Sequence, residues 1–584
     1  MSSAVLANNI QQLKDDLKTV KNLSLSEKSN HLLSNSKPLL NTLIHTLSNY
    51  DENNVDASYT NALTEYLIQY LTFDEEIAVK ALLCLYSMQK KSNNLNQILI
   101  DKIDDLLQLQ DSNHDKYNII KIVSHLFTFN PSIASQIFTQ NAQFFNIITN
   151  ETTLLSNQLT TLNNESIKQL NIILDLFSNA CVDEPSKSMI ASMYINTLLN
   201  TLSLNDSTIY DQSKSYAVVI IVKIWRMIKP DVLNANVPLL CLKNLFQITL
   251  KCLQRNYPAS IEALSLLSTN MQIRQLLRNE ELIKLLLKLI NDTNSTKFGI
   301  LSILSSIITP QRIQKLLTKS SLTIKDPNSI NYFDINTNEK FDPKSIDDDL
   351  DSIKSCCNLL YKNEFISNYI VPFFKSNNPS QKLIGECIYL MYYLLFPDID
   401  HKTNYLDGKR IKESALMVKL IVGYLLGSSQ NIKYTHKSFI QFDDPTKEFT
   451  EEQLQYRSVA IKALSSPFIS ENASSLYSQD LEKAAIPFIL EMIVQHDIDI
   501  GIISETKITP FGKLKKQIFN NFDVYYGYVN LAALASTFKD KTQNIICTLG
   551  LDSITNTLRE TDEMLQNGAL QVLNEISDYP LFSK

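Results

Sequence analysis

Apolar residues recur along most of the chain with the spacing of amphipathic helices. In the stretch LNIILDLF (residues 170–177), one stripe contains Ile172, Ile173, Leu176 and Phe177. Apolar positions three and four residues apart are typical of an α-helix that packs one face against a neighbour. The pattern therefore predicts helix after helix, joined by polar turns.

Similar apolar blocks follow at intervals, at residues 215–225, 261–268, 298–308, 352–361, 456–465, 525–536 and 568–577. Gly527 and Gly568 are 41 positions apart, and Ser265 and Ser302 are 37 apart. A period near 40 residues is typical of armadillo and HEAT-type repeats, which bury their apolar faces only against neighbouring repeats. The sequence thus predicts an all-α fold, an armadillo/HEAT-like helical-repeat superhelix or solenoid.

One long segment interrupts the helical pattern. Residues 323–351 contain Pro327, Pro343, many asparagines and a cluster of acids. Such composition predicts a linker. We therefore expect a first helical array over residues 1–322, a linker over 323–351 and a second array over 352–584. Shorter irregular segments at 428–448 and 496–522 interrupt the second array.

Glycine is scarce, and its scarcity bears on function. The chain has 10 glycines in 584 residues, none before Gly299, and no G-x-x-x-x-G-K-[ST], G-x-G-x-x-G or G-x-S-x-G. Loops that cradle phosphate, and the nucleophile elbow, depend on glycine at tight backbone positions. We expect a binding scaffold that needs no cofactor and has no catalytic residues, so the protein is predicted not to be an enzyme.

Charge and hydropathy indicate which partners and which cellular location to expect. The net charge is −7, and the basic residues are scattered among acids, which argues against nucleic acid as a partner. The longest apolar stretches, 216–225 and 388–396, are too short to cross a bilayer. We expect a cytoplasmic protein without membrane insertion.

Metal binding is not predicted. The seven histidines show no metal-ligand spacing, and the eight cysteines, mostly inside apolar runs, form no C-x-x-C. Asp334, Asn336, Asn338 and Asp342 resemble a calcium loop faintly. However, Glu339 stands where such a loop needs glycine, and Ser345 where it needs glutamate.

A basic loop is a candidate contact site. Lys513, Lys515 and Lys516 lie between Phe511 and Phe519 in the irregular segment 496–522. Binding residues concentrate on loops held by rigid scaffolds. The loop is therefore either a partner contact or a solvated connection.

Several segments of the chain together resemble one family. They are, in chain order, LFSNACVDE (176–184), VVIIVKIW (218–225), CNLLYKNEFI (357–366), AAIPFILEMI (484–493), YYGYVNLAALAS (525–536) and DEMLQNGALQVLNEISDYPL (562–581). In kind and order they are similar to the UCS-domain myosin chaperones, especially the fungal members, which lack a TPR module. The resemblance runs from about residue 170 to the end. The family continues through further repeats, so the chain looks C-terminally shortened.

The resemblance implies a function. A member would bind the myosin motor domain and assist its folding or stability without consuming nucleotide, with effects on actin-dependent transport and endocytosis. Without a TPR module, binding of heat-shock protein 90 would need other surfaces. An uncapped last repeat would expose apolar surface, which predicts a tendency to self-associate.

The family's groove maps onto particular residues here. The resemblance implies partner contacts at Asn358, Tyr526, Asn530 and Asn574, with the three lysines of the basic loop. Tyr526 and Asn530 are four positions apart and so share a helix face. In two repeats the family's asparagine position falls on Ala533 and Glu575 instead, with Asn530 and Asn574 nearby.

A second class of function remains open. Armadillo-type adaptors of the nuclear-import kind bind extended peptides along a ladder of tryptophan and asparagine. The chain has one tryptophan, Trp225, which argues against that alternative.

Overall fold

The computed structural model describes residues 3–577, apart from gaps at 24, 50–56, 93, 110–112, 159–162, 206, 256, 293–295, 310–349, 376–379, 396–407, 429–431, 436–437, 443–449 and 503–518. Contacts divide the described residues into two units, one ending at Leu267 and one beginning at Ser268. Helices α18 to α20 thus belong to the second unit. The predicted linker lies almost entirely outside the described residues, so the predicted domain boundaries stay a prediction.

The first unit is built from short and medium helices. They are α1 (Ser3–Asn22), α2 (Leu25–His31), the π-helix η1 (Leu32–Ser36), α3 (Lys37–Ser48), α4 (Ala57–Tyr70), α5 (Glu75–Gln89), α6 (Leu95–Gln108), α7 (Asn113–Phe129), α8 (Pro131–Gln140), α9 (Ala142–Asn157), α10 (Asn164–Ala180), α11 (Glu184–Met193), α12 (Ile195–Leu202), η2 (Thr208–Tyr210), α13 (Asp211–Ile224), η3 (Trp225–Met227), α14 (Pro230–Ala235), α15 (Val237–Leu240), α16 (Leu242–Leu253) and α17 (Pro258–Leu267).

The second unit is also helical. Its elements are α18 (Met271–Leu277), α19 (Glu280–Asp292), α20 (Lys297–Ile308), α22 (Leu350–Lys362), η5 (Ile366–Ile370), α23 (Val371–Lys375), α24 (Gln381–Leu395), α25 (Gly408–Ser428), β1 (Ile432–Thr435), β2 (Ser438–Phe442), α26 (Glu451–Leu464), α27 (Pro467–Glu471), α28 (Ala473–Leu476), α29 (Gln479–Asp499), α30 (Asn521–Phe538), α31 (Asp540–Leu549), α32 (Leu551–Thr557) and α33 (Glu563–Ile576). β1 and β2 pair as an antiparallel hairpin, an exception to the otherwise helical elements described.

Polar residues set where many helices begin. The side chain of Asn163 accepts a hydrogen bond from the backbone N–H of Ser166 at the start of α10. Asn520 and Asp523 form a reciprocal capping box at the start of α30. Such caps satisfy backbone donors that a helix cannot pair internally. The polar turns read from the sequence therefore begin helices as well as end them.

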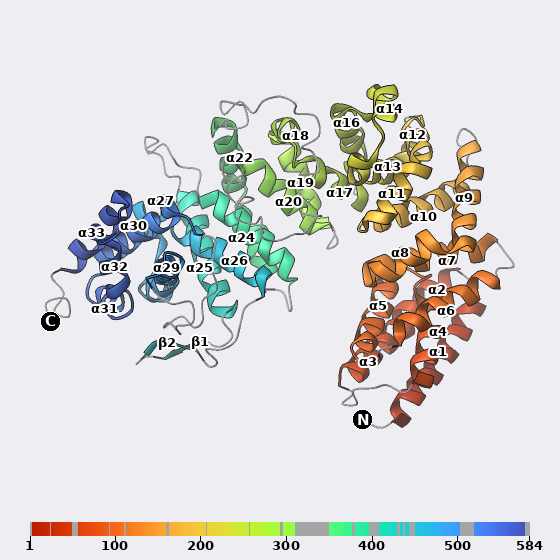
Figure 1. Ribbon diagram of the computed structural model, residues 1–584, viewed down its shortest axis with the longest axis horizontal. Coiled ribbons are helices and arrows are strands. Elements are labelled where there is room, and N and C mark those ends of the chain that lie inside the picture. Colours follow the sequence, from red (N-terminus) through yellow and green to blue (C-terminus); the bar gives the residue numbers. More distant parts are fainter. Residues whose placement is uncertain are drawn as a thin grey trace. The chain divides into compact units, whose positions relative to one another are not determined.

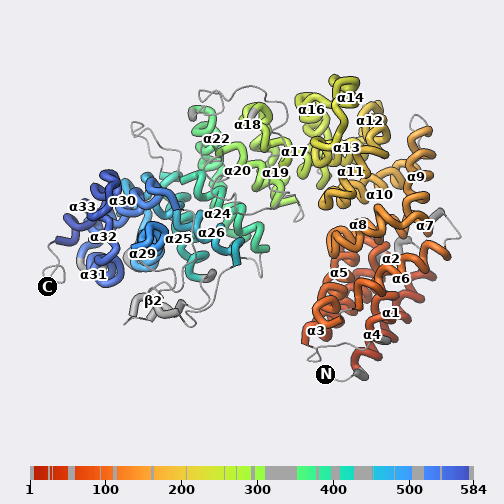
Figure 2. Tube along the Cα trace, in the orientation of Figure 1, coloured from red at the N-terminus to blue at the C-terminus, as the bar shows by residue number. Residues whose placement is uncertain are grey.

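Successive helices pack side by side within each unit. In the first unit α7 packs on α10, α10 on α13, and α13 on α17; in the second, α20 packs on α24, and α24 on α26. Figure 1 shows these helices following one another, and in Figure 2 the sequence colours succeed each other within each unit. Every residue from Ala217 to Val222 on α13 is buried. A helix covered on all sides needs apolar residues all round, which explains the run AVVIIV.

Hydrogen bonds between neighbouring repeats confirm the predicted period. Asn171 Nδ2 donates to Gln212 Oε1 at 3.2 Å, a separation of 41 residues along the chain. Tyr216 donates to Asp175 Oδ1 at 3.1 Å, again across 41 residues. In the second unit Asn521 and Asp562 are linked at the same separation. The all-α helical-repeat fold is thus confirmed.

Two glycines mark places where helices approach closely. A Cβ atom on Gly385 of α24 would lie 2.2 Å from the ring of Tyr456 on α26. A Cβ atom on Gly568 of α33 would lie 3.0 Å from the Cβ of Tyr528 on α30. Tyrosine therefore packs onto glycine at two helix–helix contacts of the second unit.

We predict that Gly385→Ala destabilises the protein, because the added methyl group would have to displace the Tyr456 ring. Overpacking of this kind costs about 1–3 kcal/mol. Gly423→Ala is the matched control, since nothing lies within 4 Å of a Cβ there and the position is inside helix α25. Alanine at Gly423 should leave stability unchanged or raise it by up to about 1 kcal/mol. Thermal melts measure the Tm of both variants. An equal decrease in Tm for the two variants would contradict this account.

Candidate partner-binding surface

Asn358 lies on the exposed face of α22 and opens onto a surface pocket. The pocket has a volume of about 510 Å³ and lies between α19 and α22. Glu280 and Lys284 of α19 face Lys354, Asn358 and Lys362 of α22 across it. The predicted contact residue Asn358 is therefore accessible, and its surroundings are mainly polar.

Tyr526 and Asn530 lie on α30, as the spacing predicts, but their environments differ. Tyr526 is half-buried, with its ring centroid 5.4 Å from that of Tyr525. Asn530 is completely buried, and its Nδ2 donates a hydrogen bond to the carbonyl oxygen of Leu464 at the end of α26. Its Oδ1 is buried without a hydrogen-bond partner in the described structure. Asn530 thus links two helices and is closed to a partner in this conformation.

The other predicted contact residues are Asn574 and the three lysines of the basic loop. Asn574 is exposed near the end of α33, which packs against α30. Lys513, Lys515 and Lys516 lie outside the described residues. The pocket next to Asn358 is lined by α19, α22 and the residue after α22, so it includes none of the residues predicted on α30 and α33. A groove that joins all seven residues stays a prediction.

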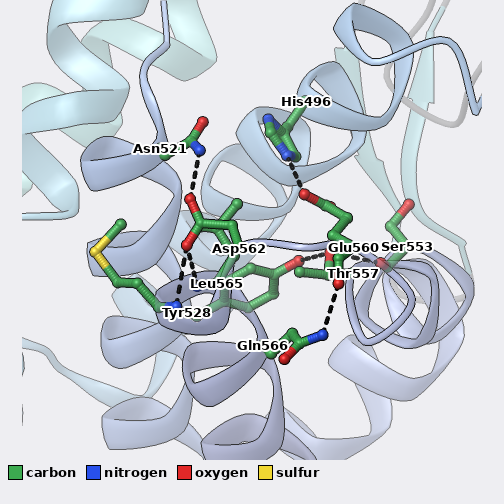
Figure 3. A network of polar contacts seen from close by, with 10 residues as sticks. His496, Asn521, Tyr528, Ser553, Thr557, Glu560, Asp562, Leu565 and Gln566 are labelled. Carbon is green, nitrogen blue, oxygen red and sulfur yellow. Dashed lines mark hydrogen bonds and ion pairs between the residues drawn. The ribbon is translucent and has the colours of Figure 1, made fainter.

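A polar network that the sequence did not reveal ties the last helices of the second unit together (Figure 3). His496 Nε2 of α29 lies 3.1 Å from Glu560 Oε2, and both side chains are largely buried. The hydroxyl groups of Tyr528 on α30 and Thr557 on α32 are 2.5 Å apart. Gln566 Nε2 on α33 donates to the backbone carbonyl of Glu560 at 2.6 Å. His496 and Tyr528 are 64 and 29 residues from their partners Glu560 and Thr557, so no local pattern could have indicated these two contacts.

Asp562 extends this network to the start of α33. Its carboxylate accepts hydrogen bonds from the backbone N–H groups of Met564 and Leu565, as an N-terminal cap. It also accepts one from Asn521 Nδ2 of α30 at 2.6 Å. The hydrogen bond from Asn521 is the main cause that lowers the pKa of Asp562. One carboxylate therefore both begins α33 and fastens it to α30.

Asp497 is a buried acid next to this network. Its side chain is completely buried at the end of α29. Burial, the largest cause, raises the pKa of Asp497 to about 6, although the nearby Ser553, Asn556 and His496 oppose the rise. Neither carboxylate oxygen has a hydrogen-bond partner among the described residues. Ionisation of this carboxyl group therefore costs more free energy in the folded protein than in the unfolded chain.

A buried ion pair joins α26 to α29. Arg457 Nε lies 2.9 Å from Glu491 Oε1, and Nη2 of the same guanidinium contacts Oε2. Both side chains are 1% exposed, and the guanidinium lies 5.2 Å from the ring centroid of Phe488. Removing one partner of such a pair leaves an uncompensated buried charge, so the pair fixes how these two helices meet.

Metal-ligating side chains and cysteines are further possible sites in the described part of the chain. It contains no group of three or more His, Cys, Asp and Glu side chains that could hold a metal ion. All eight cysteines are free; six are buried, Cys241 is exposed and Cys547 is half-buried. Burial raises the pKa of Cys84 to about 12, which keeps that thiol protonated. None of the described helices has the length and hydrophobicity needed to cross a membrane.

Comparison with known proteins relates part of this chain to a protein family. Residues 37–265, most of the first unit, match the family model described as "Myosin-binding striated muscle assembly central" (UNC45-central). This match confirms the predicted resemblance to the UCS-domain myosin chaperones. It begins well before residue 170, where the sequence motifs begin. No curated protein sequence gives a match.

Solved structures share the fold of this chain. The structure described as "Crystal structure of She4p" aligns with a TM-score of 0.60 at 16% identity, over 99% of this chain and 66% of She4p. The structure described as "Molecular features of the UNC-45 chaperone critical for binding and folding muscle myosin" aligns with a TM-score of 0.53 at 13% identity, over 94% of this chain and 52% of UNC-45. The chain thus spans less than two thirds of either protein. At these identities the two structures show that this chain shares their helical-repeat fold.

We predict that Asn530→Ala lowers the stability of the protein more than Tyr526→Ala does. Asn530→Ala removes the hydrogen bond to the Leu464 carbonyl and leaves a cavity, which should cost about 1–3 kcal/mol of stability. Tyr526→Ala, at a half-buried position on the same helix face, should cost less. Chemical denaturation measures both. Equal stability of the Asn530 variant and the wild type would contradict the structural role.

We predict that Asp497→Asn stabilises the protein at neutral pH and not in acid. The folded pKa of about 6 lies above the ordinary value of 3.8, so ionisation of Asp497 costs stability as the pH rises through this interval. At about 1.4 kcal/mol per unit, the gain from asparagine at pH 7.5 is at most about 3 kcal/mol and should shrink towards pH 4. Thermal melts across this range measure it, with the exposed Asp552→Asn as control. A gain that does not depend on pH would refute the assignment.

Proposed function

We propose that this chain binds the motor domain of myosin and assists its folding or protects it from aggregation. The observation that carries the proposal is the UNC45-central match over residues 37–265. Support also comes from the likeness in fold to a chaperone whose description names binding and folding of muscle myosin. Because the chain spans 66% and 52% of the two aligned proteins, their activities come to it only as a proposal.

An exposed apolar stripe inside the matched region supports this proposal. Val79, Leu83 and Tyr86 on α5 are 46%, 47% and 51% exposed. Their spacing of four and three residues places them on one face of the helix. Single exposed apolar residues are common on protein surfaces, but a stripe along one helix is a surface for protein contacts. A partly folded motor domain exposes complementary apolar surface.

The mechanism would be passive. A client that still exposes apolar segments gains from covering them on the stripe, whereas a folded client has already buried them. Affinity therefore falls as folding proceeds, and release needs no nucleotide. This agrees with a sequence that has no phosphate-binding glycine motif. Binding of heat-shock protein 90, self-association, a cytoplasmic location and a role in actin-dependent transport and endocytosis stay predictions.

The alternative is an armadillo-type cargo or scaffold adaptor that binds extended peptides. It would use exposed tryptophans along successive helices. Trp225, the one tryptophan of the chain, is buried with 7% of its surface exposed. The structure therefore offers that alternative no tryptophan surface.

We predict that the full chain slows the heat-induced aggregation of a purified myosin motor domain, as measured by light scattering. Val79→Ser/Leu83→Ser should weaken this protection at least about fivefold in the concentration needed, because two of the three apolar contacts become polar.

Leu154→Ser is the control, since Leu154 is also exposed but lies on α9 outside the stripe. Unchanged scattering in the presence of the wild-type chain would rule out the proposed function. Retention of a basic nuclear-localisation peptide, but not of the motor, in a pull-down would favour the adaptor.

A further inference from the structure

The pocket between α19 and α22 is lined mainly by polar side chains. Its volume of about 510 Å³ falls within the range of about 300–1,000 Å³ typical of ligand sites. Most such sites are apolar, but one aliphatic side chain, Leu359, lines this pocket among eight polar and charged residues. The pocket is therefore suited to a polar occupant and poorly suited to an apolar one.

Positive charge in the pocket exceeds negative charge. Lys284, Lys354 and Lys362 face it, against Glu280 and Asp351. Glu280 is already paired with Lys284 at 2.7 Å. That hydrogen bond is the largest cause lowering the pKa of Glu280, and the charge of Lys362 contributes further. Lys354 and Lys362 form no ion pair with any carboxylate of the described residues, so within this part of the chain two ammonium groups are available to an anion.

The two available lysines are regularly spaced with an amide between them. Lys354, Asn358 and Lys362 stand at positions i, i+4 and i+8 of α22, which places them on one face. Eight residues of α-helix span about 12 Å. The backbone positions of Lys354 and Lys362 are therefore far enough apart for two separate anionic groups. Four residues of extended peptide cover about 13 Å, so two acidic side chains four residues apart match the row.

The central amide completes the match to a peptide. An asparagine side chain offers both a donor and an acceptor, as does each residue of a peptide backbone. Asn358 is exposed and stands midway between the two lysines. It can therefore bond the backbone of a segment whose acidic side chains reach Lys354 and Lys362.

We propose that the pocket between α19 and α22 binds an extended acidic segment of a protein partner, with Lys354 and Lys362 each holding one carboxylate and Asn358 holding the backbone between them. This site is independent of the apolar stripe on α5 and does not require that the partner be myosin. It assigns Asn358 a role that none of the other predicted groove residues shares.

The test is fluorescence anisotropy of the full chain with a labelled peptide, Glu-Ser-Gly-Ser-Glu. The matched probe is Gln-Ser-Gly-Ser-Gln. We expect the glutamate peptide to bind at least about tenfold more tightly than the glutamine peptide, and to weaken from about 0.05 M to about 0.5 M salt because the contacts are exposed to solvent. Absence of binding by the glutamate peptide, or equal binding of both peptides, overturns the proposal.

Variants localise the binding. Lys354→Gln/Lys362→Gln should lower the affinity for the glutamate peptide at least about tenfold, and Asn358→Ala about threefold. Lys288→Gln/Lys375→Gln removes two exposed lysines of the same unit that do not line the pocket, and should change affinity less than about twofold. An equal loss in both double variants would show a general charge effect and refute the site. Circular dichroism melts check that each variant is folded.

A competition experiment with phosphate distinguishes a site for an extended peptide from a site for a small anion. Inorganic phosphate should displace the glutamate peptide only through its general effect on ionic strength, matched by sodium chloride. Displacement by phosphate well beyond that of sodium chloride would show a small-anion site and overturn the extended-segment assignment. The motor-aggregation assay does not depend on this pocket, so failure here leaves the proposed function standing, and the reverse also holds.

Discussion

Lateral packing of one helix against the next is the interaction on which the structure depends. Each repeat is too small to bury its own apolar stripe, so it is stable only when neighbours cover it. Helix α13 illustrates this, because α10, α16 and α17 surround it and its central residues are all buried. Stability is therefore distributed along the unit, and a local defect is felt first by the adjoining helices.

Polar contacts decide how these apolar faces align. Burial by itself is non-directional, and a helix could slide along its neighbour at little cost. The hydrogen bond from Tyr216 to Asp175, the Arg457–Glu491 pair and the cap at Asp562 each join a particular residue to a particular helix. Because a buried charge without its partner is expensive, the Arg457–Glu491 pair in particular disfavours alternative alignments.

The same arrangement provides the two surfaces on which the proposed binding rests. A scaffold held together by lateral packing can leave chosen side chains outside the packed faces. On α5 these are apolar, at Val79, Leu83 and Tyr86. On α22 they are basic and amide, at Lys354, Asn358 and Lys362. The two units therefore present surfaces of different chemistry, one suited to exposed apolar segments and the other to acidic ones.

The sequence by itself determined the helical class, the period near 40 residues and the resemblance to a chaperone family, because helical periodicity and the order of motifs are local properties of the chain. It did not determine which polar residues stay on the surface. Asn530 and Asn358 are both asparagines on helices, yet one is buried against α26 and the other faces solvent. The partners of His496 and Arg457 were equally unpredictable, since they come from other segments of the chain. Burial and pairing depend on which helices meet, and only the tertiary structure decides that.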